Sequence, residues 1–292
     1  MTIRPRRSVL YMPGSNARAI EKARTLAADA LILDLEDAVA PEAKEAARKQ
    51  VCDAVAARGF GNRELIIRIN GISSPWGEDD LAAAAAARPD AILVPKVSSP
   101  EALAMVGRRL AALKSDQATR IWAMIETPAA ILNIADIADA ADDSITRLAC
   151  FVMGTNDLAK ETRARFLPGR AAFMPWLMQA VAAARANDID ILDGVYNDLQ
   201  DEAGYRAECE QGRDCGFDGK TLIHPGQIAA ANEIFAPSAG EVEQAEKIIA
   251  AFASPENAGK GAISLDGRMV ELLHAEIAKR TVAMADAIAA RN

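Results

Sequence analysis

The sequence has few of the residues that bind transition metals or form disulfide frameworks. Its 292 residues include only two histidines and four cysteines, and no two of the cysteines have the CxxC spacing. We therefore expect neither a zinc or iron site nor a disulfide framework. Free thiols are typical of a reducing compartment, so we predict a cytoplasmic protein.

Excess positive charge and long apolar runs are also lacking. The formal net charge is −8, which argues against a general binder of nucleic acid or of membrane surfaces. No apolar run approaches the roughly 20 residues that cross a bilayer. No apolar segment typical of a secretory signal follows the basic stretch that ends at Arg7. We therefore expect small-molecule partners, with no nucleic acid and no membrane.

What the chain does contain is a regular alternation of short apolar strands and helical segments. Eight such units fit between Ser8 and Phe235, which favours an α/β protein with a (β/α)8 TIM barrel. A doubly wound open sheet is the alternative, but no GxGxxG follows the first strand. The predicted strands are Ser8–Met12, Ala30–Leu33, Leu65–Ile69, Ala91–Val94, Arg120–Glu126, Leu148–Met153, Ile189–Leu192 and Phe217–Ile223.

The pattern changes near Pro237, so we predict a barrel of residues 1–236 and a C-terminal helical extension of residues 237–292. The extension would hold a helix at Glu241–Phe252, a short strand near Ala262 and a long helix at Met269–Ala289. It is too small for a core of its own. We expect it to pack on the barrel or on a neighbouring subunit.

Four successive strands end in a charged residue, and these residues are Arg68, Lys96, Glu126 and Asp157. Charges at the ends of buried strands are costly unless they are paired or bound to a ligand. Because the sites of barrels gather at the carboxyl ends of the strands, a shared site is favoured. Two carboxylates with open positions suit Mg²⁺, so Glu126 and Asp157 are the predicted metal ligands.

Each of these residues also has a simpler interpretation. Asp157 alone would be a favourable charge in the first turn of a helix that Thr155 or Asn156 caps. Arg68 would clamp a carboxylate or a developing oxyanion, or form a structural ion pair with Glu36 or Glu126.

The remaining charged candidates are weaker. Asp34, Glu36 and Asp37 form an acidic cluster that would orient metal-bound waters, or are solvated loop acids. Lys96 and Lys220 would balance the charge of this cluster. His224 precedes a proline that starts a helix, and we expect it to be structural or to line the substrate site.

Seven segments, taken in order, resemble the citrate lyase β-subunit and malyl-CoA lyase family of acyl-CoA carbon–carbon lyases, within the HpcH/HpaI aldolase superfamily. The segments are RSVLYMPGSN, ALILDLEDAV, LIIRIN, AMIETPAA, GTNDL, DGKTLIHPGQI and DGRMVE. They extend from about Arg7 to Glu271, nearly the whole chain. The resemblance implies a Mg²⁺-dependent barrel enzyme that assembles as a homotrimer or hexamer.

The resemblance also implies roles for individual residues. Glu126 and Asp157 match the metal carboxylates, and Arg68 matches the substrate arginine. The acids that surround the metal site match Glu36 and Asp37, and coenzyme A contacts could fall at Arg7 and Arg18. The lyases often carry an Asp in the tail motif, supplied to a neighbouring subunit, where this chain has the longer Glu271.

We therefore predict reversible cleavage of a 3-hydroxy-acyl-CoA, of the malyl-, citramalyl- or citryl-CoA type, into a short acyl-CoA and a 2-oxo acid. Backbone N–H groups at Asn156 and Asp157 would bind the substrate carboxylate at a helix start. Glu271 or Asp37 would transfer the proton. Three alternatives remain: a malyl-CoA thioesterase with the same Mg²⁺ site, a CoA-independent 2-oxo acid aldolase, and a non-catalytic binding module.

Overall fold

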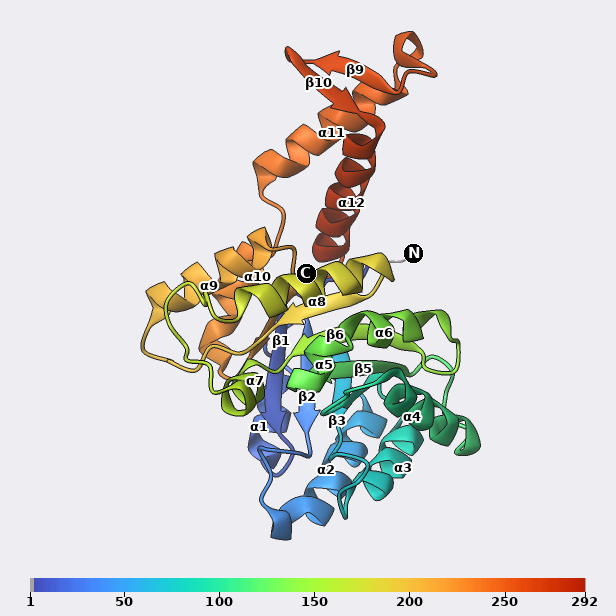
Figure 1. Ribbon diagram of the computed structural model, residues 1–292, viewed down its shortest axis with the longest axis vertical. Helices are drawn as coiled ribbons and strands as arrows, with labels where there is room; N and C mark the ends of the chain where they lie inside the picture. The colour runs from blue at the N-terminus through green and yellow to red at the C-terminus, as the bar shows by residue number, and fades with distance from the viewer. Residues whose placement is uncertain (1–2, 292) are drawn as a thin grey trace. The chain divides into compact units, whose positions relative to one another are not determined.

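Eight parallel strands close into a barrel in the structure, a computed structural model that describes residues 3–291 (Figure 1). Each strand pairs with the next along the chain, and β8 pairs with β1. The predicted TIM barrel is therefore confirmed, and the open doubly wound sheet is wrong. The strands are β1 (Ser8–Pro13), β2 (Ala30–Asp34), β3 (Glu64–Arg68), β4 (Ala91–Val94), β5 (Arg120–Ile125), β6 (Leu148–Met153), β7 (Asp190–Asp193) and β8 (Gly219–Leu222).

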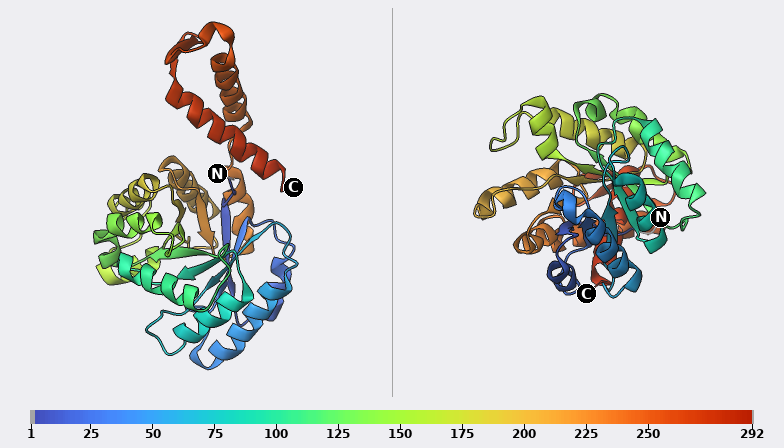
Figure 2. Two further views of the ribbon diagram at one scale, coloured as in Figure 1. Left: turned by 90° about the vertical axis from the view of Figure 1, so that its right-hand side faces the viewer. Right: turned by 90° about the horizontal axis from the view of Figure 1, so that it is seen from below.

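Helices follow the strands and lie on the outside of the barrel, as both views in Figure 2 show. They are α1 (Ala17–Ala23), α2 (Lys44–Ala57), α3 (Gly77–Ala87), α4 (Pro100–Ala112), α5 (Pro128–Leu132), α6 (Ile134–Asp139), α7 (Thr155–Thr162), α8 (Met174–Ala186), α9 (Glu202–Asp214) and α10 (Ile228–Ile234). Among residues 3–291, no helix has the length and apolar character needed to cross a bilayer.

Apolar strand residues fill the barrel, and an ion network lies at the opposite end from the strand termini that carry the predicted site. The apolar cluster includes Ile32, Ile66 and Trp122. Arg6, just before β1, donates two 2.7 Å hydrogen bonds to Glu64 and stacks 4.9 Å from the centre of the Trp122 ring. The burial of these strands leaves their carboxyl ends as a fixed frame for side chains.

Contacts between Cα atoms divide the chain into two compact units, residues 6–232 and residues 233–291 with 3–5. The second unit holds α11 (Ala239–Ala253), which packs against α12 (Leu272–Ala289), and an antiparallel hairpin of β9 (Ala262–Leu265) and β10 (Arg268–Glu271). The predicted helix from Met269 was therefore placed three residues too early, because β10 occupies Met269–Glu271. Glu271 is the N-cap of α12.

Candidate active site

A cavity of about 310 Å³ lies at the carboxyl ends of the barrel strands. One guanidinium, that of Arg68, and four carboxylates line it, so negative charge exceeds positive charge. The structure thereby brings together the predicted residues Arg68, Asp37, Glu126, Asn156 and Asp157. The same wall includes the apolar residues Tyr11, Met124, Met153, Val195 and Ile223, to which sequence reasoning gave no role.

Arg68 is held by Asp34, which faces it in the register of β2 and β3. Arg68 Nε and Nη2 each donate a 2.6 Å hydrogen bond to one Asp34 oxygen, and both side chains are buried. A bidentate pair of this kind fixes both the position and the plane of the guanidinium. Nη1 is left to face Glu36 Oε2 at 3.0 Å and Asp37 Oδ2 at 3.3 Å.

The loop after β2, which carries Glu36 and Asp37, is fixed from two sides. The Asp34 carboxylate accepts hydrogen bonds from the backbone N–H groups of Glu36 at 2.9 Å and Ala38 at 3.0 Å. Buried Lys44 donates to the carbonyl oxygens of Leu35 at 2.8 Å and Glu36 at 2.7 Å. These bonds therefore fix the backbone of the loop that carries Glu36 and Asp37.

The two acids of this loop differ in burial. Glu36 is buried, and burial raises its pKa to about 7, an effect that Arg68 opposes and Asp37 adds to. Its Oε1 lies 3.8 Å from Lys96 Nζ. The Asp37 side chain is 64% exposed. Glu36 therefore sits behind the cavity wall beside Arg68, whereas Asp37 is open to solvent and to the cavity.

Glu126 is as deeply buried as Asp34 among the acids of the cavity, at 1% exposure. Its Oε1 accepts a 2.7 Å hydrogen bond from the backbone N–H of Lys96, whose positive φ of 53° places it in the left-handed region. No residue within 3–291 donates a hydrogen bond to Oε2. Burial and the nearby charge of Glu36 raise the Glu126 pKa to about 8, which the Lys96 N–H and Arg68 only partly offset.

Gly154 makes room for this carboxylate. A Cβ at position 154 would lie 2.4 Å from Glu126 Cβ and 2.7 Å from Glu126 Oε2. Both distances are too short for any side chain. Glu126 can therefore occupy its position only because residue 154, between β6 and α7, is a glycine. Its backbone φ of −96° is ordinary, so close approach rather than conformation requires glycine here.

Helix α7 places Asp157 at the cavity. The helix begins at Thr155 with Gly154 as N-cap and has no side-chain cap, so the predicted cap at Thr155 or Asn156 was wrong. Asp157 is half-buried in the first turn, where negative charge is favourable. Asn156 forms a reciprocal amide pair with Asn197, with N–O distances of 3.2 and 2.8 Å.

The donor set of the cavity fits a hard divalent cation. Among the described residues, Glu126 Oε2 has no hydrogen-bond donor and Asp157 accepts no hydrogen bond, and both side chains line the cavity. Carboxylates with room for waters and for substrate oxygens are the ligands that Mg²⁺ prefers. Among the described residues, no group of three or more His, Cys, Asp or Glu forms a cage that could hold a metal by itself.

Lys220 and His224 belong to structures outside this cavity. Fully buried Lys220 donates to Asp193 at 2.8 Å and to Glu208 at 2.7 Å. We had expected Lys220 to balance the charge of the acidic cluster at Asp34, Glu36 and Asp37. It does not, because its partners are Asp193 and Glu208. His224 Nδ1 accepts a 3.0 Å hydrogen bond from the Gly226 N–H and has a structural role.

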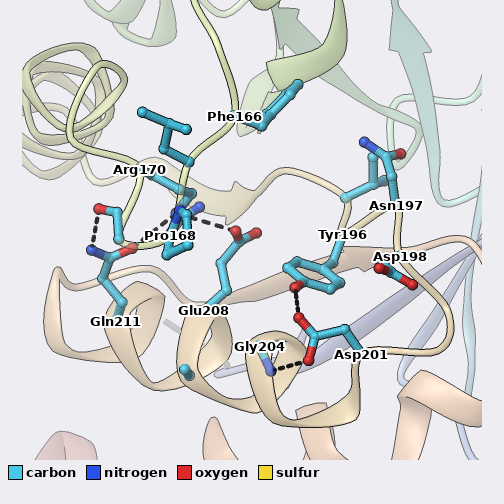
Figure 3. A pocket seen from close by; sticks show the side chains of 14 residues that line it. Phe166, Pro168, Arg170, Tyr196, Asn197, Asp198, Asp201, Gly204, Glu208 and Gln211 are labelled. Carbon is cyan, nitrogen blue, oxygen red and sulfur yellow. Dashed lines mark hydrogen bonds and ion pairs between the residues drawn. The ribbon is translucent and has the colours of Figure 1, made fainter.

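A second cavity of about 440 Å³ lies beside α9 and is shown in Figure 3. Its wall includes Phe166, Tyr196 and Asp201, and the Tyr196 hydroxyl donates a 2.6 Å hydrogen bond to Asp201 (Figure 3). None of the predicted site residues lines this cavity.

Two predicted residues of the barrel unit, Arg7 and Arg18, do not line the main cavity. Arg7 precedes β1, at the opposite end of the barrel, and its guanidinium pairs with Asp29 at 2.8 Å. The structure therefore does not support Arg7 as a coenzyme A contact. Arg18 is exposed in α1, directly after the carboxyl end of β1. Glu271 belongs to the second compact unit.

Comparisons with known proteins agree with the barrel fold. A profile of the HpcH/HpaI aldolase/citrate lyase family matches residues 7–225. The chain is 51% identical to a (3S)-malyl-CoA thioesterase of Cereibacter sphaeroides, over 98% of this chain and 96% of the relative. It is 32% identical to the citrate lyase β subunit of Escherichia coli, over 92% and 89%. The CitE protein of Mycobacterium tuberculosis, solved with magnesium, acetoacetate and coenzyme A, matches with TM-score 0.74 and 27% identity, over 95% and 97%.

Replacing Gly154 with alanine should disturb the site through Glu126. The new methyl group would overlap Glu126 Cβ and Oε2, so we expect Mg²⁺ affinity, measured by calorimetry, to fall at least about tenfold. Gly71→Ala is the matched control, because a Cβ at Gly71 meets no atom within 4 Å. Unchanged Mg²⁺ affinity in Gly154→Ala would show that Glu126 is not a ligand or that it moves freely.

The raised pKa of Glu126 predicts how stability depends on pH in protein kept free of divalent metal by chelator. From the ordinary value of 4.5 up to about 8, the folded state holds a proton on Glu126 that the unfolded chain has released. The free energy of unfolding should therefore fall as pH rises through this range, by up to about 1.4 kcal/mol per pH unit for this one proton.

Urea unfolding of Glu126→Gln between about pH 5 and about pH 8 checks this prediction. The variant should lose the part of the slope that Glu126 supplies, whereas the exposed control Glu45→Gln should keep the wild-type slope. A Glu126→Gln slope equal to that of the wild type would mean that Glu126 has an ordinary pKa.

Proposed function

The chain belongs to the HpcH/HpaI aldolase/citrate lyase family, and we propose that it is a Mg²⁺-dependent thioesterase for a 3-hydroxy-acyl-CoA of the malyl type. The observation that carries the proposal is the cavity in which buried Glu126 and Arg68 and half-buried Asp157 meet. The choice of hydrolysis is supported by the 51% identity to a (3S)-malyl-CoA thioesterase over nearly the whole chain.

In the proposed site, Glu126 and Asp157 would hold Mg²⁺, and Glu36 and Asp37 are the nearby acids that would orient its waters. When bound, Mg²⁺ supplies Lewis-acid polarisation of substrate oxygens. The fit rests on the Glu126 oxygen that has no protein donor and on the excess of carboxylates in the cavity. Structures of the CitE protein with magnesium support the same choice of metal.

The chain's own residues bind the substrate and orient it for attack. Arg68 Nη1 points away from the Asp34 pair and donates to the thioester oxygen, where negative charge develops. The free N–H groups in the first turn of α7, at Asn156 and Asp157, receive the substrate carboxylate. Arg18, exposed after β1, is the proposed contact for coenzyme A phosphate.

Hydrolysis adds a water oxygen to the thioester carbon and breaks the carbon–sulfur bond. One water proton passes to a base, and coenzyme A leaves as the thiol. Asp37, exposed at the cavity, and Glu271, supplied by a neighbouring subunit, are the proposed groups for these proton transfers.

Carbon–carbon cleavage to a short acyl-CoA and a 2-oxo acid is the second candidate. It uses the same metal carboxylates and Arg68, and the 32% identity to a citrate lyase β subunit favours it. The two reactions break different bonds, and only hydrolysis consumes a water molecule, so the products rather than the site geometry distinguish them.

We also propose that residues 233–291 contact a neighbouring copy of the chain, in a homotrimer or hexamer. Four apolar side chains around the β10–α12 junction are exposed: Met269 at 72%, Leu272 at 54%, Leu273 at 52% and Ile277 at 60%. Exposed apolar residues clustered along one segment are typical of an interface. Glu271 lies between Met269 and Leu272 in the sequence, so an interface formed by these exposed residues would place Glu271 beside another subunit.

The products from (3S)-malyl-CoA test the proposed function. With Mg²⁺ we expect free coenzyme A thiol and malate, detected by a thiol reagent and by mass spectrometry. Glu126→Gln and Asp157→Asn should each lower Mg²⁺ affinity and turnover at least about 100-fold, whereas Asp136→Asn, on an exposed acid of α6, should not.

Each other result has a distinct meaning. Acetyl-CoA and glyoxylate in place of free thiol would make the protein a lyase. Activity only on 2-oxo acids that lack coenzyme A would make it an aldolase. Wild-type Mg²⁺ affinity in both Glu126→Gln and Asp157→Asn would show that the proposed metal site is wrong.

The shared-site proposal for Glu271 predicts complementation between inactive variants. Glu271→Gln should lose far more turnover than Mg²⁺ affinity, because the metal carboxylates stay in place. When it is mixed with Glu126→Gln under conditions of subunit exchange, some activity should return, since some sites then combine two intact halves.

Exchange is verified with subunits that carry different labels. If exchange occurs and no activity returns, or if Glu271→Gln alone is fully active, then Glu271 acts only as the N-cap of α12, where its N–H donates to His274.

A further inference from the structure

Tyr11 lies in the catalytic cavity but has no part in the mechanism so far. It comes from β1, its ring packs against the apolar cluster inside the barrel, and it lines the cavity with Arg68 and Glu126. The guanidinium carbon of Arg68 is 5.0 Å from the centre of the ring, a cation–π distance. Because Asp34 fixes Arg68, the position of the ring is fixed as well.

The Tyr11 hydroxyl has a poor hydrogen-bond partner. Among the described residues its acceptor is the thioether sulfur of Met124, 3.7 Å from Oη. A thioether is a weak acceptor, whereas buried tyrosine hydroxyls usually find a stronger one. Phenylalanine would fill the same apolar space without this deficit, so packing alone does not account for the hydroxyl.

A second donor points at the same sulfur. Arg68 Nη1, which also faces Glu36 and Asp37, lies 3.8 Å from Met124 Sδ, so Oη and Nη1 both contact this one sulfur at the cavity wall. A substrate oxygen beside the sulfur would be within reach of both. Burial raises the pKa of Tyr11, so the hydroxyl stays protonated and able to donate at neutral pH.

We propose that Tyr11 Oη donates a hydrogen bond to the thioester carbonyl oxygen of the substrate, beside Arg68 Nη1, and is thus a catalytic residue. This inference rests on the proposed function, because it requires an acyl-CoA substrate. In hydrolysis that oxygen carries the negative charge when water adds to the carbon, and it returns to a carbonyl when the carbon–sulfur bond breaks. In carbon–carbon cleavage the same oxygen carries the enolate charge, so the donor pair serves either reaction.

Tyr11→Phe removes the hydroxyl and keeps the ring. We expect kcat on the malyl-type thioester to fall about 10- to 100-fold, while the midpoint of urea unfolding stays the same or rises, because only a weak hydrogen bond is lost. Tyr196→Phe is the matched control. Its hydroxyl bonds Asp201 in the cavity beside α9, so this variant should keep the wild-type kcat.

A double-mutant cycle with Met124→Leu tests whether the Tyr11 hydroxyl contacts the substrate or only holds the Met124 sulfur in place. If the hydroxyl acts only by holding Met124 in place, Tyr11→Phe will have no further effect on kcat in the Met124→Leu background. If it contacts the substrate, the fall in kcat will recur there. An unchanged kcat in Tyr11→Phe, or a fall that vanishes in the Met124→Leu background, overturns the proposal.

Failure of the proposed function would give a different result. If the wild type turns over no thioester, the proposed function is wrong. Calorimetry with acetyl-CoA and Mg²⁺ then tests whether Tyr11 contacts the thioester. An affinity about three- to tenfold weaker in Tyr11→Phe than in the wild type supports the contact. Equal affinities overturn it.

Discussion

The buried ion pair between Arg68 and Asp34 sets the geometry of the catalytic end of the barrel. The two residues face each other across β2 and β3, and two 2.6 Å hydrogen bonds join them. Asp34 also accepts the N–H groups that shape the Glu36 loop. Removing one partner of a buried pair leaves an uncompensated charge, which costs about 3–5 kcal/mol. The pair therefore fixes both the loop and the direction in which Arg68 Nη1 points.

Among the described residues, no Lys or Arg forms an ion pair with the buried Glu126 carboxylate. One oxygen is held by the Lys96 N–H, and Gly154 leaves space for the other. Without a cation, burial favours the protonated form, as the raised pKa of about 8 indicates. A divalent cation would favour the carboxylate instead. The same burial that makes Glu126 costly in the free protein therefore makes it a strong ligand once a cation is present.

The sequence was sufficient to predict the barrel because apolar runs of strand length recur between helical segments, and all eight strands lie close to their predicted places. It also located Arg68, Glu126 and Asp157, since strand ends in a barrel share one face. It anticipated Glu36 as one partner of Arg68, but it did not predict the main pairings. Spacing does not say that Arg68 takes Asp34 as its main partner, or that Lys220 turns to Asp193 and Glu208. Tyr11 was missed because an aromatic residue inside an apolar strand looks like core, and only its position at the cavity distinguishes it.

Two clusters of charge at the strand ends show which part of the barrel is reserved for a ligand. At β7 and β8, Asp193 and Glu208 meet Lys220 and Arg170 within hydrogen-bond or ion-pair distance. Although burial opposes ionisation of Asp193, Lys220 and Arg170 hold its pKa below the ordinary value. At β2 to β6 burial prevails, and the pKa values of Glu36 and Glu126 are raised. In the first cluster the protein's own cations outweigh burial and keep the acid ionised, whereas in the second burial outweighs Arg68 and Lys96, so an added cation would stabilise the ionised forms of Glu36 and Glu126.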